Sequence, residues 1–194
     1  MTVSSCQKVL DMLRAKGIKM FSYGVTTPRT DSGWIKLFRF AKNMGIKTIL
    51  AEPTKEQIPF VSKLADEYNI DVAIHNHPKP TLYWNPEILL DALKGASPHI
   101  GACADIGHWV RSGLDPIECM KKLRGHIMEF HMKDLNEKGV LDAHDVPWGT
   151  GVSNIAGIMR EMKSQGFKGM VSVEYEYHWH NSIPEVKPSL AFLK

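Results

Sequence analysis

Four residues with metal-binding side chains lie at the ends of apolar stretches that are typical of β-strands. Glu52 comes after Thr-Ile-Leu-Ala, Asp105 after Ile-Gly-Ala-Cys-Ala, His131 after Ile-Met-Glu-Phe, and Glu174 after Met-Val-Ser-Val. Two glutamates, an aspartate and an imidazole form a mixed oxygen and nitrogen donor set. Such a set suits Mn²⁺, Mg²⁺, Co²⁺ or Zn²⁺ better than a metal that prefers thiolates. We therefore expect one divalent metal ion to be bound by Glu52, Asp105, His131 and Glu174.

Each of these residues also has a simpler interpretation, as a helix cap or as a solvated loop charge. It is their repetition at equivalent strand ends that favours a shared site, because carboxylates facing one another repel unless a cation lies between them. His75, which follows Asp-Val-Ala-Ile, is a neutral donor for substrate hydroxyls. Trp148 could stack on a sugar ring or simply pack. Glu176 would share a strand face with Glu174, so it competes for the ligand role.

The segments that must position these residues alternate between two patterns. Short β-rich runs occupy residues 18–25, 46–52, 71–75, 100–105, 126–131 and 170–175. Apolar residues three and four apart predict helices over about 5–16, 32–44, 55–68, 86–95, 115–123, 153–165 and 185–194. The residues expected to begin helices as N-caps are Asp31, Asn85, Asp115 and Ser153.

This alternation predicts an α/β fold with a parallel sheet, since each crossover helix must cover one face of the sheet. No Gly-x-Gly-x-x-Gly motif follows the first strand, which disfavours a dinucleotide-binding open sheet. In a (β/α) barrel the carboxyl ends of the strands converge on one mouth, where active sites form. The polar strand ends therefore favour a TIM-barrel type of fold.

The composition excludes several classes of function. The 194 residues are 43% hydrophobic and carry 24 Lys and Arg against 21 Asp and Glu, a net charge of +3. This balance indicates neither a nucleic-acid partner nor a membrane partner. The chain shows no secretory leader and no Cys-x-x-Cys among its three cysteines, so we expect a cytoplasmic protein without a disulfide scaffold.

At these residues the sequence resembles the sugar phosphate isomerase/epimerase superfamily, the xylose isomerase-like TIM barrels. The resemblance covers essentially the whole chain and implies one domain over residues 1–194. Its motifs are Glu52-Pro, His75-Asn-His-Pro, Asp105-Ile-Gly-His108, His131-Met-Lys-Asp134, Trp148-Gly-Thr-Gly151 and Val-Ser-Val-Glu174-Tyr-Glu.

The resemblance implies a divalent-metal-dependent sugar isomerase or epimerase that abstracts a proton next to a carbonyl and forms an enediolate. Glu52 and Glu174 would be its acid/base pair as well as metal ligands. A small carbohydrate would be the substrate, with His108 on its oxygens and Lys133 near the site. The expected substrate-binding residues are then His75, His108, Lys133 and Trp148.

Six strands are visible, whereas a closed barrel has eight. The two strands that are missing would precede residue 5, which would leave open edges at 18–25 and 170–175 and favours a possible homodimer. Three other functions stay open. One is a metal-dependent lyase or hydratase acting on 3-keto-sugars or inosose-like polyols, and another is a three-zinc enzyme like the AP endonucleases. The third is an inactive, truncated barrel.

Overall fold

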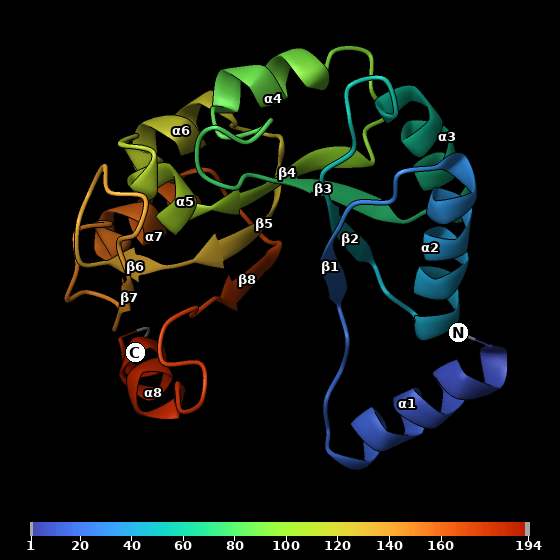
Figure 1. The fold of residues 1–194 in the computed structure, drawn as a ribbon, viewed down its shortest axis with the longest axis horizontal. Coiled ribbons are helices and arrows are strands. Elements are labelled where there is room, and N and C mark those ends of the chain that lie inside the picture. Colours follow the sequence, from blue (N-terminus) through green and yellow to red (C-terminus); the bar gives the residue numbers. More distant parts are fainter. Residues whose placement is uncertain (1, 193–194) are drawn as a thin grey trace. The chain divides into compact units, whose positions relative to one another are not determined.

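A computed structural model describes residues 2–192 and shows an α/β fold built on six parallel strands (Figure 1). The strands are β1 (Ser22–Thr26), β2 (Thr48–Ala51), β3 (Asp71–His75), β4 (Ile100–Asp105), β5 (Ile127–Met132) and β8 (Met170–Val173). They are ordered β1-β2-β3-β4-β5-β8, so neighbours in the sheet follow one another along the chain. This confirms the predicted fold class, an incomplete barrel of the TIM type.

Eight helices are described within residues 2–192. They are α1 (Val3–Ala15), α2 (Asp31–Met44), α3 (Ile58–Tyr68), α4 (Pro86–Ala92), α5 (Ile106–Arg111), α6 (Pro116–Lys122), α7 (Ile155–Ser164) and α8 (Ile183–Ala191). Two short strands, β6 (Asp134–Leu135) and β7 (Asp145–Val146), form a separate antiparallel pair. Over this part of the chain, no helix combines the length and the apolar character needed to cross a membrane.

The chain divides into two compact units, of which the first comprises Met1–His75 and Ala92–Gly101. In this unit α2 and α3 lie along β1, β2 and β3, while α1 lies where α2 ends (Figure 1). The buried side chains of α2 recur every three or four residues, at Trp34, Phe38, Ala41 and Met44. This is the stripe that the sequence pattern predicts, and it packs α2 into the core of the unit.

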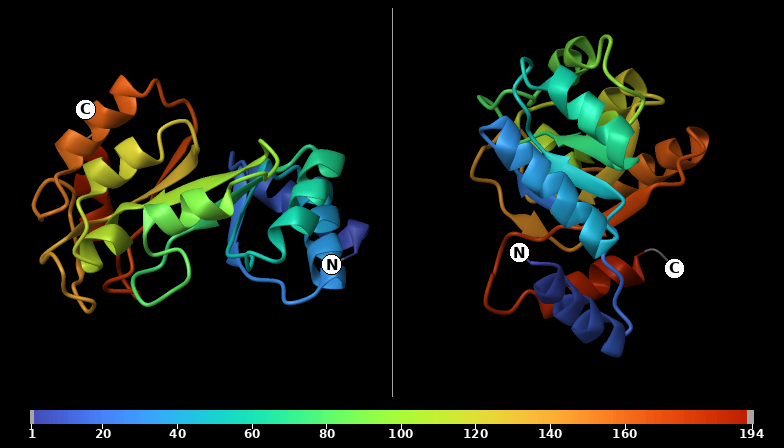
Figure 2. Two further views of the ribbon diagram at one scale, coloured as in Figure 1. Left: turned by 90° about the horizontal axis from the view of Figure 1, so that it is seen from above. Right: turned by 90° about the vertical axis from the view of Figure 1, so that its right-hand side faces the viewer.

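The second unit comprises Asn76–Asp91 and Ala102–Lys194. Here α5, α6 and α7 lie on one side of β5 and β8, whereas α8 lies apart from them, beyond the segment that follows β8 (Figures 1 and 2). The largest buried side chains of this core include Trp109, Phe130 and Met120. The prediction of one domain over residues 1–194 stays a prediction.

The predicted elements are confirmed in kind and order, with four differences. α5 was not predicted, and the helix expected over 185–194 is α8, with residues 193–194 outside the described range. The cap of α2 is Thr30 rather than Asp31, because the Thr30 hydroxyl accepts from the Gly33 N–H. The cap of α7 is likewise Asn154 rather than Ser153.

β1 and β8 occupy the two ends of the strand order, so each has one edge without a neighbour in this sheet. Tyr23 and Val25 on β1 and Val171 on β8 are exposed. Pairing of these edges in a homodimer stays a prediction.

Candidate metal centre and active site

The end of β4 is shaped by the two carboxylate oxygens of Asp105. Oδ1 accepts a 2.8 Å hydrogen bond from the His108 N–H and so caps α5, the helix that begins directly after the strand. The Asp105 N–H and C=O are paired with the Asn76 side-chain amide, both at 2.9 Å. These bonds fix Asp105, which is fully buried, so that Oδ2 is held among the side chains described next.

Three of the four predicted metal ligands lie together in the second unit. Asp105, His131 and Glu174 each offer a ligand atom, and these atoms all lie within 4.8 Å of one another. The His131 Nδ1 contacts Glu174 Oε2 and lies 4.0 Å from Asp105 Oδ2. Each residue comes from the carboxyl end of a different strand, β4, β5 or β8, as the sequence pattern predicts.

Glu129 lies on the other side of the His131 ring and was not predicted as a site residue. Its Oε1 is 3.8 Å from His131 Nε2 and accepts a 3.0 Å hydrogen bond from the Ser172 hydroxyl. Metal-binding histidines commonly have a carboxylate at the ring nitrogen that does not bind the metal, which fixes the ring orientation. The signal in the sequence was a Glu two residues before His131, on the same face of an apolar strand.

Lys133 is a fully buried cation in contact with three carboxylates. Its Nζ lies 3.0 Å from Asp105 Oδ2, 3.4 Å from Glu174 Oε1 and 2.8 Å from Glu176 Oε2. Burial opposes the charged form, but these carboxylates outweigh it and hold the pKa of Lys133 above its ordinary value. Gly107 of α5 makes room for the lysine, since a Cβ there would lie 2.7 Å from Lys133 Cβ.

Glu176, the competitor for the ligand role, is engaged elsewhere. Besides Lys133, it binds Arg111, whose Nη1 lies 3.1 Å from Glu176 Oε2 and whose Nη2 lies 3.7 Å from Asp145 Oδ2. Burial disfavours ionisation of Glu176, but Lys133 and Arg111 more than compensate and lower its pKa to about 2. A carboxylate held by two cations is less available to a metal than Glu174.

Two predicted substrate-binding residues of the second unit, His108 and Trp148, have different surroundings. His108 is buried, with Nε2 3.3 Å from Lys133 Nζ and Nδ1 3.2 Å from Arg111 Nη1. Trp148 is also buried, and its N–H donates to the Ser189 hydroxyl at 3.1 Å. His108 therefore belongs to the charged cluster, whereas the Trp148 ring is largely covered by protein.

Glu52 and His75 belong to the first unit. Glu52 directly follows β2 and His75 is the last residue of β3, so both stand at carboxyl ends of strands, as predicted. His75 Nδ1 lies 3.7 Å from Glu52 Oε1, and the His75 side chain is buried.

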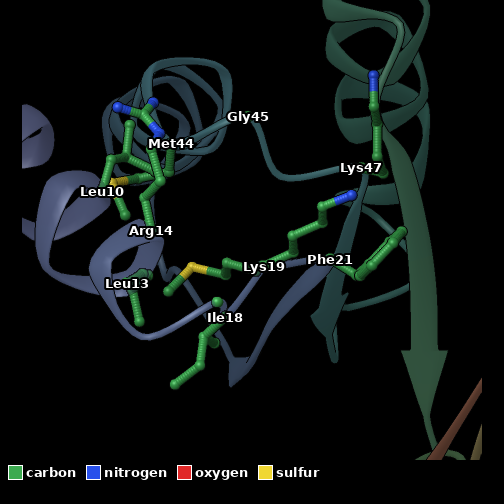
Figure 3. Close-up of a pocket in the computed structure, with 11 residues that line it drawn as sticks. Leu10, Leu13, Arg14, Ile18, Lys19, Phe21, Met44, Gly45 and Lys47 are labelled. Carbon is green, nitrogen blue, oxygen red and sulfur yellow. The ribbon is translucent and has the colours of Figure 1, made fainter.

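A pocket of about 400 Å³ in the first unit is chemically different from this cluster (Figure 3). It is lined by α1, by the segment leading into β1 and by the end of α2, and so lies at the amino end of β1. Its side chains are apolar or basic, including Leu13, Phe21 and Lys47, with no carboxylate or histidine among those that line it. The pocket has none of the donors that a divalent metal requires.

Fold and strand-end residues together define a member of the xylose isomerase-like TIM barrels. The model of that family matches residues 32–194, and the chain belongs to this family. A crystal structure of an uncharacterized protein from Parabacteroides distasonis is 38% identical, with a TM-score of 0.77, over all of this chain and 77% of that one. The protein MJ1311 of Methanocaldococcus jannaschii is 31% identical over 120 residues, which is 59% of this chain but only 40% of MJ1311.

Two more distant solved structures share the fold. One is the IolI protein with a bound zinc atom, 19% identical with a TM-score of 0.76 over 97% of this chain and 80% of that one. The other is the 3-keto-D-glucoside 4-epimerase YcjR from E. coli, 11% identical with a TM-score of 0.79 over 98% of this chain and 84% of that one. At these identities the likeness concerns the fold alone.

Proposed function

We propose that this protein is a divalent-metal-dependent sugar isomerase or epimerase that abstracts a proton next to a carbonyl. The observation that carries the proposal is the set Asp105, His131 and Glu174, whose ligand atoms lie within 4.8 Å of one another. Membership of the xylose isomerase-like family supports it. So do the zinc atom of IolI and the named activity of YcjR.

The charges of the cluster fit a divalent cation. Lys133 faces three carboxylates, those of Asp105, Glu174 and Glu176, and Glu129 adds a further buried carboxylate. Arg111 is already opposed by Asp145. The excess negative charge is costly to bury without a counter-ion. Asp105, His131 and Glu174 would hold the ion, and Glu52 is retained from the sequence argument as the fourth ligand.

When bound, a divalent ion would polarise the sugar carbonyl as a Lewis acid. The chain's own groups would then move the proton. The Glu174 carboxylate accepts the proton from the carbon beside the carbonyl, and Glu52 donates one on the opposite face to give an epimer. Donation at the neighbouring carbon instead gives an isomer. His108, held by Lys133 and Arg111, would donate to a substrate oxygen.

The test begins with metal. Protein treated with a chelator should bind one equivalent of Mn²⁺, Co²⁺, Zn²⁺ or Mg²⁺ per chain and melt at a higher temperature when loaded, because the ligand binds only the folded state. Glu174→Gln should lose most of this stabilisation. Glu118→Gln, a change at an exposed helix residue paired with Lys121, is the matched control and should bind metal normally.

Activity is then measured on free ketohexoses and on 3-keto-glycosides. A new epimer or isomer, lost in Glu174→Gln while the circular dichroism spectrum is unchanged, supports the proposal. Release of the aglycone would instead assign the same base to elimination, the lyase alternative. Three zinc ions per chain would point to an enzyme like the AP endonucleases, and normal metal binding by Glu174→Gln would refute the proposed centre.

A further inference from the structure

An exposed tryptophan follows the proposed active site along the chain. Trp179 lies five residues after Glu174, and its exposed fraction is 75%, although a tryptophan gains much free energy from burial. Beside it is a pocket of about 440 Å³, which is within the usual range for small-ligand sites. The pocket is lined by His178, Trp179, His180, Asn181, Pro184 and Glu185.

The backbone that carries Trp179 is anchored by the residues that come before it. Before it, Glu176 is held by Lys133 and Arg111, and its N–H donates to Asp145 Oδ2 at 3.0 Å. The Tyr177 ring is stacked on the His144 ring with centroids 4.4 Å apart. A backbone segment that is already held in place loses little conformational entropy when a ligand binds.

His178, which lines the pocket, also helps to hold this backbone in place. Its φ is 49°, in the left-handed region that residues other than glycine seldom adopt, and its ring lies 4.0 Å from the Tyr177 ring. His178 Nδ1 is 3.0 Å from Glu185 Oε1. Glu185 Oε2 is buried and, among the described residues, has no hydrogen-bond partner. Leaving a buried acceptor without a partner costs free energy, so a ligand hydroxyl that reached this oxygen would be bound favourably.

These groups match the chemistry of a carbohydrate ring. A pyranose has an apolar C–H face, which packs on an aromatic face, and a rim of hydroxyls that both donate and accept hydrogen bonds. Trp179 supplies the aromatic face. His180, Asn181 and Glu185 supply donors and acceptors at the rim.

We propose that Trp179 and this pocket bind a second sugar ring, so that the substrate is a glycoside or disaccharide rather than a free monosaccharide. This inference rests on the proposed function, because it assigns the reacting sugar to the metal centre and its attached ring to the pocket. Glu174 of the proposed metal centre and Trp179 of the pocket both lie on the segment that follows β8, five residues apart. The ring attached to the reacting sugar would pack on Trp179 and bind Glu185 through a hydroxyl.

Binding, measured by isothermal titration calorimetry, tests this without turnover. Wild-type protein should bind cellobiose or maltose about tenfold more tightly than D-glucose. Trp179→Ala should reduce this preference to less than twofold, whereas Trp179→Phe, which keeps an aromatic face, should retain most of it. Glu185→Gln keeps the shape of the side chain and should weaken disaccharide binding by a few fold.

The inference is overturned if Trp179→Ala binds the disaccharides as tightly as wild type, or if wild type binds glucose and the disaccharides equally well. Metal binding by the same variants separates this result from the proposed function. Trp179→Ala should still bind one metal ion, as wild type does. If Trp179-dependent sugar binding is found but no metal binds, the proposed function fails and the sugar site stands.

Discussion

Replacing Asp134 should open the loop that carries Trp148. The buried Asp134 carboxylate accepts four backbone N–H groups. Oδ2 accepts from Gly149 at 2.8 Å and from Gly151 at 3.0 Å, while Oδ1 accepts from Ser153 at 2.9 Å and from Leu135 at 3.1 Å. Three of these donors belong to residues 147–153, so one side chain ties the whole loop to β6.

The magnitude follows from counting those bonds in Asp134→Asn. An asparagine keeps one oxygen but presents an NH₂ group to two N–H donors, so two of the four hydrogen bonds are lost. A hydrogen bond to a charged group contributes about 1.5–3 kcal/mol, which gives a destabilisation of about 3–6 kcal/mol. That is a large part of the ~5–15 kcal/mol by which domains are stable.

Urea unfolding followed by circular dichroism measures this loss, with Asp142→Asn as the control because Asp142 is an exposed residue between β6 and β7. Asp134→Asn should unfold at a much lower urea concentration, and the control should match wild type. If only the loop opens, the midpoint moves little but a protease cuts within residues 147–153. The reasoning is refuted if Asp134→Asn equals the control in both stability and protease resistance.

Three further predictions concern the charged cluster in metal-free protein. Lys133→Met should lower the free energy of unfolding by about 3–5 kcal/mol, because it leaves buried carboxylates without their cation; a calorimetric melting curve measures the loss, and a change below about 1 kcal/mol would contradict it. Gly107→Ala should displace Lys133, since its Cβ would lie 2.7 Å from Lys133 Cβ, and so should reproduce part of that loss in the same measurement. Burial raises the pKa of Asp145 from 3.8 to about 6, so the folded state holds this proton more tightly than the unfolded state. The stability that results is fully present below about pH 4, and about 3 kcal/mol of it is lost as the pH rises through 6. Urea unfolding at a series of pH values should show this component in wild type and not in Asp145→Asn.

The sequence was sufficient to predict the strands and the residues at their ends. β3 and β4 have the predicted bounds, because each apolar run ends in a polar residue, His75 or Asp105, which is the last residue of its strand. The α2 helix was predicted from its apolar period in the same way. The predicted cap of α2 was wrong, since Thr30 and Asp31 are both good capping residues and local geometry decides between them.

The contacts that determine which charged residues pair with one another could not be predicted from the sequence. Arg111 lies on α5, a helix of six residues that is too short for its apolar period to show. Its contacts with Glu176 and Asp145 join residues 65 and 34 positions away in the sequence. Glu129 was missed for a different reason. Whether it lies beside His131 in the cluster depends on which face of β5 points toward the cluster.

The choice between Glu174 and Glu176 shows how the cluster distributes its charges. Two residues apart on one segment, the two carboxylates share Lys133, at 3.4 and 2.8 Å, but only Glu176 also contacts Arg111. Each cation that Glu176 binds satisfies part of its charge, while Glu174 is left beside His131 and the buried Asp105. Glu174 contacts fewer cations than Glu176, so a divalent ion stabilises its charged form more. Arg111, which pairs with Glu176 and Asp145, therefore helps to decide which glutamate binds the metal.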